Sequence, residues 1–235
     1  VGFGGALSVV KADALISGTT SAFAAGGTIS ASKLSVDAHD ISTATAFALS
    51  TGLSTGVALS AVKATSKINR TTEAYLAAGT LNTGSGAVDV HATSSSKSDL
   101  DGASIAAGFA AVSLVLLDST VATTTSAFVG DGANVTSGTL DVKADAFNIV
   151  TSTSVNLSIS LGGGNETFIT ATDDSTIEAR IGPAKGATSG NAAVAATGDV
   201  NVTALLTSRA VARAIGLTFG LFGTIGDMHG TATNT

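Results

Sequence analysis

A strict two-residue alternation between residues 43 and 62 constrains the fold more than any other feature. In this stretch, TATAFALSTGLSTGVALSAV, the odd positions up to Leu59 carry Thr, Phe, Leu and Val, and the even positions up to Ser60 carry Ala, Ser and Gly. Successive side chains of a β-strand point to opposite faces, so this pattern predicts a strand with one bulky face and one small-residue face. Neither face carries a charge. We therefore expect both faces to be covered, the small-residue face by a closely approaching neighbour.

Two short motifs recur along the chain with a common period. The first, apolar-x-Val-x-Ala, begins at positions 54, 52 and 60 residues apart: Leu34, Val88, Leu140 and Val200. The second has a central alanine, and its alanines are 52, 53 and 52 residues apart: Ala22, Ala74, Ala127 and Ala179. Two independent motifs with one period predict repeats of about 52 residues.

The single long interval points to an insertion after Ile181. The distance from the first motif's alanine to the next central alanine stays at 36, 35 and 35 residues, so the extra residues lie in the connection GPAKGATSGNAAVAATG, which contains Pro183. The predicted organisation is a single repetitive segment over 1–235, and the chain starts and stops within a repeat, as an excerpt of a longer polypeptide would. It has a partial repeat at each end and three full repeats between: 1–33, 34–87, 88–139, 140–199 and 200–235.

A helical alternative does not fit the alternation. An amphipathic helix needs apolar residues at i, i+3, i+4 and i+7, whereas Phe47, Leu49, Leu53, Val57 and Leu59 all keep one parity. We therefore predict an all-β chain with few or no helices, in which repeats stack in register as a parallel β-solenoid. Each repeat makes either two coils or one wide, flat coil, and the unbroken parity favours the wide coil. Facing small residues would bring two sheets closer than the usual distance of about 10 Å.

Composition excludes several functional classes. The net charge of −6 leaves no basic stripe for nucleic acid, and the absence of Cys excludes a disulfide-stapled domain. The most apolar run, residues 105–117, is shorter than the roughly 20 residues that a membrane-spanning helix requires. We therefore expect a chain that is not transmembrane and does not bind nucleic acid.

The recurring apolar-x-Val-x-Ala strand, the Ala/Gly/Ser alternation and the Ser21-Ala22-Phe23 strand with its Gly-rich turn resemble the repeat regions of giant bacterial filamentous adhesins. The leukotoxin-type and filamentous-haemagglutinin-like groups are the most similar, although the period of about 52 is long for the haemagglutinin shaft. The resemblance implies a secreted β-solenoid shaft, with adhesive or toxic functions elsewhere in the molecule. It assigns no functional residue to this chain.

No residues form a recognisable catalytic, cofactor or metal site. Aligning the repeats puts His39 and His91 out of register and predicts that they lie on opposite faces. The acidic residues read as solvated turn carboxylates, without the calcium-binding nonapeptide of β-rolls: Asp99, Asp101, Asp131, Asp173 and Asp174. The Gly162–Asn165 cluster reads as a turn, and no G-x-S-x-G elbow is present. We expect no enzyme activity, no cofactor and no metal.

Three aromatic residues occupy equivalent positions and predict a ladder: Phe23, Tyr75 and Phe128. A core stack is the favoured interpretation, and a sugar-binding platform is the alternative. Thr43 and Thr45 fall opposite Lys97 and Asp99, and the Thr123–Thr125 run falls elsewhere in its repeat. We therefore expect no threonine ladder across layers to support ice binding. Asn69 and Asn134 head glycosylation triplets.

The leading hypothesis is a non-catalytic structural shaft of an extracellular filament or large surface adhesin. It would self-associate through strand edges, solenoid ends and Ala/Gly/Ser faces, with other copies of itself as partners. The alternative is a carbohydrate- or surface-binding solenoid module that contacts cell-surface glycans, with ice-binding and polysaccharide lyase activities ranked lower.

Overall fold

The computed structural model describes residues 4–183 and 190–235, and this part of the chain contains strands and turns but no helix. Parallel pairing between successive repeats builds one large sheet system and one small sheet. The strands are β1 (Gly5–Ala24), β2 (Thr28–Ser30), β3 (Leu34–Leu53), β4 (Val57–Leu76), β5 (Gly79–Asn82), β6 (Ala87–Val121), β7 (Thr124–Val129), β8 (Ala133–Ser137), β9 (Thr139–Asp173), β10 (Thr176–Ile181), β11 (Ala193–Ala196), β12 (Val200–Gly220) and β13 (Thr224–Asn234).

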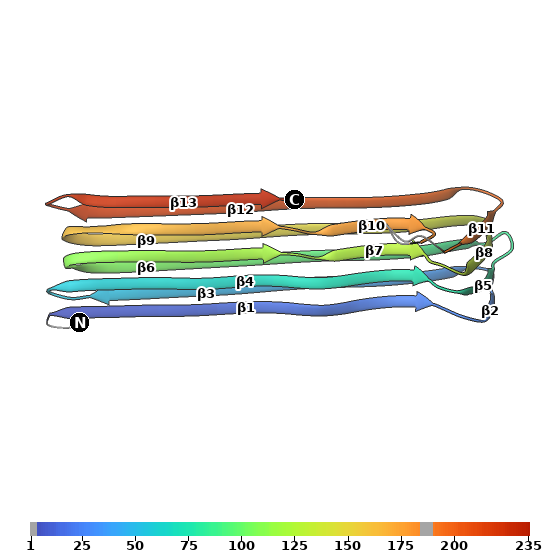
Figure 1. Cartoon of the computed structure of the whole chain (residues 1–235), viewed down its shortest axis with the longest axis horizontal. Helices are drawn as coiled ribbons and strands as arrows, with labels where there is room; N and C mark the ends of the chain where they lie inside the picture. Colours follow the sequence, from blue (N-terminus) through green and yellow to red (C-terminus); the bar gives the residue numbers. More distant parts are fainter. Residues whose placement is uncertain (1–3, 184–189) are drawn as a thin grey trace.

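Each repeat forms one wide, flat coil with two long sides and one short side (Figure 1). In the first complete coil, β3 is the outgoing strand, β4 returns beside it, and β5 closes the short side. In the next two coils the outgoing strand and part of the return strand are continuous, as β6 and β9, and β7 and β10 complete the return. The prediction of a parallel all-β solenoid is confirmed, with one wide coil per repeat.

The repeats stack in the predicted register. Ala22 pairs with Ala74, Ala74 with Ala127, and Ala127 with Ala179, so the four alanines form one column. The starts of the apolar-x-Val-x-Ala motif form a second column on the outgoing side: Leu34, Val88, Leu140 and Val200. Like side chains therefore lie above like along a common axis.

The small-residue faces of the two long sheets pack against each other inside the coil. Along β3 the even positions are buried and the odd positions are exposed. Some Cα atoms of β1 and of β3, which faces it, lie within 8 Å of each other, closer than the usual separation of about 10 Å. The expectation that both faces are covered is wrong for the single chain, since Phe47 and Leu49 on the bulky face are exposed to solvent.

Larger side chains fill the interior where the short sheet closes the coil. This part of the core is built from Val, Leu and Ala columns contributed by three sides: Val36, Leu76, Leu81, Val88, Val90, Val129, Val135, Leu140 and Val142. Three sides of the coil meet there and leave more room than two facing sides, so the larger side chains of the apolar-x-Val motif fit inside. The short side therefore anchors each coil.

The extra residues of the long repeat lie in the connection between β10 and β11. Twelve positions separate Ile181 from Ala193, against five between their partners Val129 and Asn134. Residues 184–189 lie outside the described part of the chain. The register resumes in β11 and β12, so the prediction that the insertion leaves the strands undisturbed is confirmed.

Candidate interaction surfaces and interior polar groups

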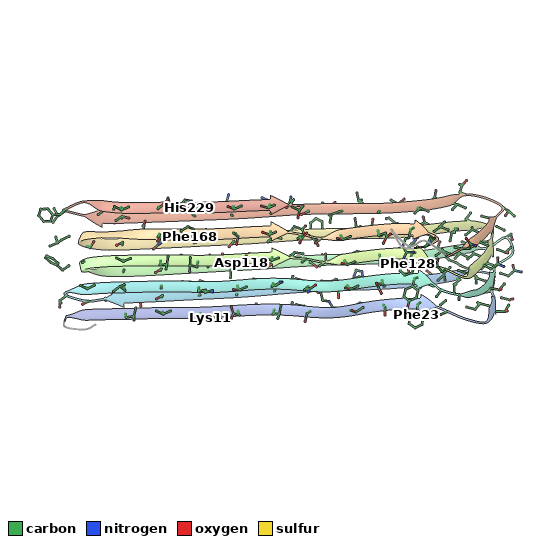
Figure 2. The ribbon with its side chains drawn as sticks, viewed as in Figure 1. Lys11, Phe23, Asp118, Phe128, Phe168 and His229 are labelled. Atoms are coloured by element: carbon green, nitrogen blue, oxygen red, sulfur yellow. The ribbon has the colours of Figure 1, made fainter. Side chains whose placement is uncertain are left out.

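Three aromatic rings stack along the axis on the outer face of the return sheet, near the short side. The centroids of Phe23 and Tyr75 lie 5.2 Å apart and those of Tyr75 and Phe128 4.9 Å apart, with interplanar angles of 11° and 2°. The guanidinium carbon of Arg180 lies 4.1 Å from the centroid of Phe128 and continues the column. Figure 2 shows Phe23 and Phe128 at the same position along the strands.

This aromatic ladder is predicted correctly in its register but not in its position. The expectation of a core stack is wrong, because Phe23 is 59% exposed and Tyr75 and Phe128 are partly exposed. A sugar platform binds through ring faces, yet here each shared face is covered by the next ring and the last by Arg180. The ladder is therefore better suited to holding successive coils together than to binding a sugar.

His39 and His91, which lie near or in the first motif, are on the same outer face, so their predicted placement on opposite faces is wrong. His91 pairs with Asp37 and Thr93 pairs with His39, as expected, but positions 37, 39, 91 and 93 all share the outward parity. His91 Nε2 lies 2.9 Å from an Asp141 oxygen and His91 Nδ1 3.6 Å from an Asp37 oxygen. His91 thus joins three coils through charged neighbours.

Several acidic residues are not in turns. Asp99 and Asp101 lie in β6, and the ammonium of Lys97 is 3.0 Å from Asp99. Asp131 is exposed in a turn, as predicted, whereas Asp173 is buried. Within residues 4–183 and 190–235, no group of three potential metal-ligating side chains comes together.

The Gly162–Asn165 cluster lies within β9, where the strand reverses direction, and not in a separate turn. Gly163 and Gly164 already pair with the return strand β13, and Asn165 is buried. A Cβ on Gly163 would lie 2.0 Å from the carbonyl oxygen of Ala111. Glycine is thus needed there because the backbones approach too closely for a side chain.

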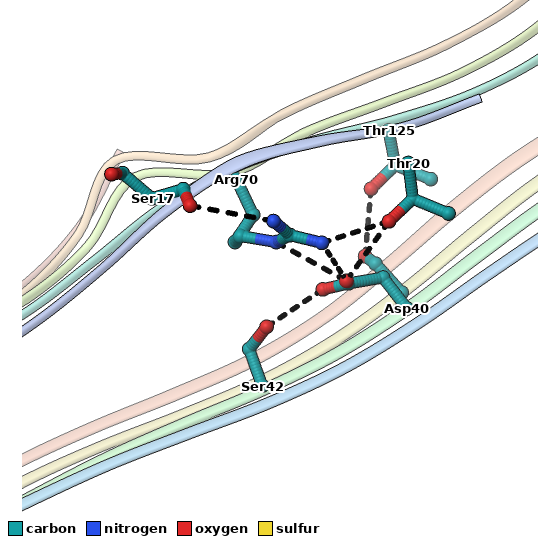
Figure 3. Close-up of polar contacts among 7 residues, drawn as sticks. Ser17, Thr20, Asp40, Ser42, Arg70 and Thr125 are labelled. Carbon is teal, nitrogen blue, oxygen red and sulfur yellow. Dashed lines mark hydrogen bonds and ion pairs between the residues drawn. The ribbon is translucent and has the colours of Figure 1, made fainter.

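A buried ion pair links the two long sheets inside the coil. Arg70 from β4 and Asp40 from β3 point toward one another (Figure 3), and their side chains are only 17% and 6% exposed. The Arg70 Nε donates to Asp40 Oδ1 at 3.2 Å, and the Arg70 Nη2 donates to Thr20 Oγ1 at 2.8 Å. Ser42 donates to the other Asp40 oxygen at 2.8 Å.

The charge state of this pair follows from its surroundings. Burial raises the pKa of Asp40, but hydrogen bonds from Arg70 and Ser42 outweigh it and hold that pKa below its ordinary value. The hydrogen bond to Asp40 raises the pKa of Arg70. Both groups are therefore charged at neutral pH, and each compensates the burial of the other.

A second polar cluster surrounds the buried carboxylate of Asp173. The Asn148 amide donates to both of its oxygens at 3.2 Å, and the hydroxyls of Ser175 and Ser208 donate as well. Asn148 and Ser208 are on the outgoing side and Asp173 on the return side. Polar groups thus join the facing sheets in the middle of the coil, where alanine and serine leave little apolar area.

The prediction that no threonine ladder crosses the layers is wrong, because one outward threonine column was missed. Thr19, Thr71, Thr124 and Thr176 pair in register three residues before the alanine column. The sequence contains the signal for this column, because each threonine lies three residues before one of the recurring central alanines. Thr43 and Thr45 do pair with Lys97 and Asp99, as predicted.

The predicted glycosylation positions are both on the outside of the coil. Asn69 lies in β4 and Asn134 in β8, and both are exposed. They are accessible to modification from solvent.

No helix in the described residues is long and apolar enough to cross a bilayer. Comparison with protein-family models, curated proteins and solved structures finds no match to this chain.

Proposed function

We propose that this chain is a non-catalytic structural shaft of an extracellular filament or large surface adhesin. The observation that carries the proposal is the unbroken register of its coils, in which columns such as Ala22, Ala74, Ala127 and Ala179 run along the axis. Backbone ladders in that direction resist bending and extension, because every layer is hydrogen-bonded to the next.

Self-association follows from the two ends of the stack. β1 and β3 pair on one side only, and so do β12 and β13 at the other end. Their remaining backbone groups can pair with another copy. The Ala/Gly/Ser faces no longer count among the self-association surfaces, since they are buried between the two sheets of the same chain.

A carbohydrate-binding module remains the alternative, with less support. Its candidate platform was the aromatic ladder, whose ring faces cover one another. A glycan array compares the two functions: binding that is lost on replacing Tyr75 with Ser would favour the alternative.

The shaft proposal predicts that copies add end to end along the axis, and that the length of the assemblies depends on the charges where two copies meet. If β13 of one copy pairs in register with β1 of the next, Thr231 lies beside Asp13, because both belong to one column that also contains Thr65, Asp118 and Thr170. Thr231→Asp is then expected to shorten the assemblies roughly twofold to fivefold, since like charges directly opposite repel. The matched variant Thr231→Lys is expected to retain their length.

Length is measured by negative-stain electron microscopy and analytical ultracentrifugation at high protein concentration. Compact monomers alone would contradict the proposal. Equal lengths for the Asp and Lys variants would contradict the pairing of β13 with β1.

A further inference from the structure

One end of every coil, where the outgoing strand turns into the return strand, carries no charged residue. We call this region the apolar tip and define it by residues in the same columns of successive coils: 4–8, 48–60, 102–113, 154–165 and 214–226. It contains no Asp, Glu, Lys, Arg or His. Charges begin in the neighbouring columns, with Asp101 and Arg213 on the outgoing side and Glu166 and Asp227 on the return side.

Large apolar side chains are exposed on three contiguous sides of the apolar tip. Leu49, Val155 and Ile215 are exposed on the outgoing face, and Leu7 and Val57 on the return face. The rim between the two faces carries further exposed residues: Phe109, Leu221 and Phe222, the last two 77% and 75% exposed. Contiguous apolar surface of this extent marks an interaction site.

We propose that the apolar tip inserts into one leaflet of a lipid bilayer. A second copy stacked on one face would leave the opposite face and the rim in water. One face is about 20 Å on each side, or roughly 400 Å², from strand spacings of about 4.8 Å and a rise of about 3.3 Å per residue. That is about half of what each partner contributes to a stable protein interface. A bilayer covers both faces and the rim together.

The depth of the apolar tip fits a single leaflet. On the return side, four residues follow the turn before the column of Glu166 and Asp227, which corresponds to about 13 Å, and the outgoing side is about 20 Å deep. One leaflet contributes about half of the roughly 30 Å hydrocarbon core. The tip therefore enters from one side and does not cross.

The interior of the apolar tip contains a chain of serine hydroxyls that bond to one another. Ser50 donates to Ser8 at 2.9 Å, Ser60 to Ser50 at 2.9 Å, Ser104 to Ser60 at 2.9 Å and Ser113 to Ser104 at 2.6 Å. These paired hydroxyls need no water, which is one condition for entering hydrocarbon. Three other buried polar atoms of the tip have no partner among the described residues: Ser154 Oγ, Asn156 Oδ1 and Ser160 Oγ.

Backbone groups of the apolar tip are paired on both sides except at its two edges. β4, β6 and β9 have neighbours above and below, whereas β1, β3, β12 and β13 are edge strands. Unpaired backbone is costly in lipid. Inserted copies are therefore expected to pair edge to edge; in this respect alone the inference rests on the proposed filament.

The experiment is flotation of the full chain with neutral phosphatidylcholine vesicles at high salt, which removes electrostatic attraction. Leu217 in the apolar tip and Leu205 in the charged part lie on the same strand, β12, and are 50% and 57% exposed. The wild type is expected to float. Leu217→Asp is expected to bind roughly 60- to 300-fold more weakly, from the cost of a charge in hydrocarbon. The matched control Leu205→Asp is expected to bind like the wild type.

A second pair of variants reports depth without adding a charge. The chain contains no Trp, so Phe219→Trp and Leu205→Trp, both at positions 57% exposed, each give one fluorescent site. Vesicles with brominated acyl chains are expected to quench the first and not the second.

Circular dichroism confirms that each variant is folded, and the Trp pair decides the question if Leu217→Asp unfolds. A wild type that stays with the vesicle-free fractions would overturn the proposal. Equal quenching of both Trp variants would do the same. So would a chain that ignores vesicles but whose oligomers dissociate on Leu217→Asp, which would make a second copy the partner. Filament growth is measured without lipid, so a failure of the shaft proposal can be distinguished from a failure of membrane insertion.

Discussion

Replacing Arg70 with Met is expected to lower the free energy of unfolding by about 2–4 kcal/mol, although the aliphatic part of the side chain is kept. The loss leaves the carboxylate of Asp40, 6% exposed, as an uncompensated charge between two sheets. Chemical denaturation followed by circular dichroism measures the change.

The matched control is Lys97→Met, which removes an ion pair from the outer surface. The ammonium of Lys97 lies 3.0 Å from Asp99, but the two side chains are 49% and 29% exposed. Exposed pairs contribute about 0–1 kcal/mol, so the control is expected to change little. Equal losses in both variants would contradict the special role of the interior pair.

The pH dependence of the same pair has a defined sign. The pKa of Asp40 is lowered in the folded state, so its contribution is complete above the unfolded value of about 3.9 and disappears as pH falls through the lower folded value. The stability difference between the wild type and Asp40→Asn should therefore be constant from about pH 7 to pH 5 and shrink below about pH 4. A difference that grew on acidification would contradict this charge assignment.

Replacing Gly138 with Ala is expected to cost about 3 kcal/mol or more, a large effect for one methyl group. Gly138 lies at the corner before the outgoing strand, where its amide donates to Gly86 at 2.8 Å and its carbonyl accepts from Gly198 at 2.7 Å. A Cβ on Gly138 would lie 2.0 Å from the carbonyl oxygen of Ser85 in the coil below. This steric clash can be relieved only if the stacked corners of neighbouring coils move apart.

Gly5→Ala is the matched control for this substitution. A Cβ there would lie 3.8 Å from the carbonyl oxygen of Val57, which is ordinary contact. Its free energy of unfolding is expected to stay within about 0.5 kcal/mol of the wild type. A small loss for Gly138→Ala, similar to that of the control, would show that the corners are not in contact as described.

The strands, the period and the register could be predicted from sequence because one module is repeated. Once Ala22 and Ala74 are recognised as equivalent, the other pairings of the same two strands follow by counting, and the column continues through Ala127 and Ala179. The same counting reveals the column of Thr71 and its equivalents. Because the repeats stack in register, residues at equivalent positions of the repeat lie directly above one another in the structure.

Which face of a strand points inward could not be read from alternation alone. The pattern around Phe47 shows only that bulky residues share a face, and the usual rule that they form the core would place them inside. Here the inward face is set by Ala48 and its equivalents, because two long sheets approach too closely for larger side chains. Tyr75 has the outward parity, which is why the aromatic ladder lies outside.

Contacts between the facing sheets could also not be predicted from the sequence. Asp40 and Arg70 lie 30 residues apart on antiparallel sides of one coil, and their meeting depends on how the turn near residue 55 offsets β3 against β4. Register within a sheet follows the repeat, but the offset across the coil does not. The apolar tip could not be predicted for the same reason, because it combines residues from the outgoing and return sides of the coil.

The most direct test of in-register stacking is a distance between positions far apart in sequence. The chain has no Cys, so spin labels attached at Thr19→Cys and Thr176→Cys occupy unique sites, 157 residues apart. Their column, through Thr71 and Thr124, places them three layers apart, or about 14 Å between backbones. Electron paramagnetic resonance should give a short distance close to that value, broadened by the label linkers, whereas a separation beyond about 30 Å would contradict the stacked architecture.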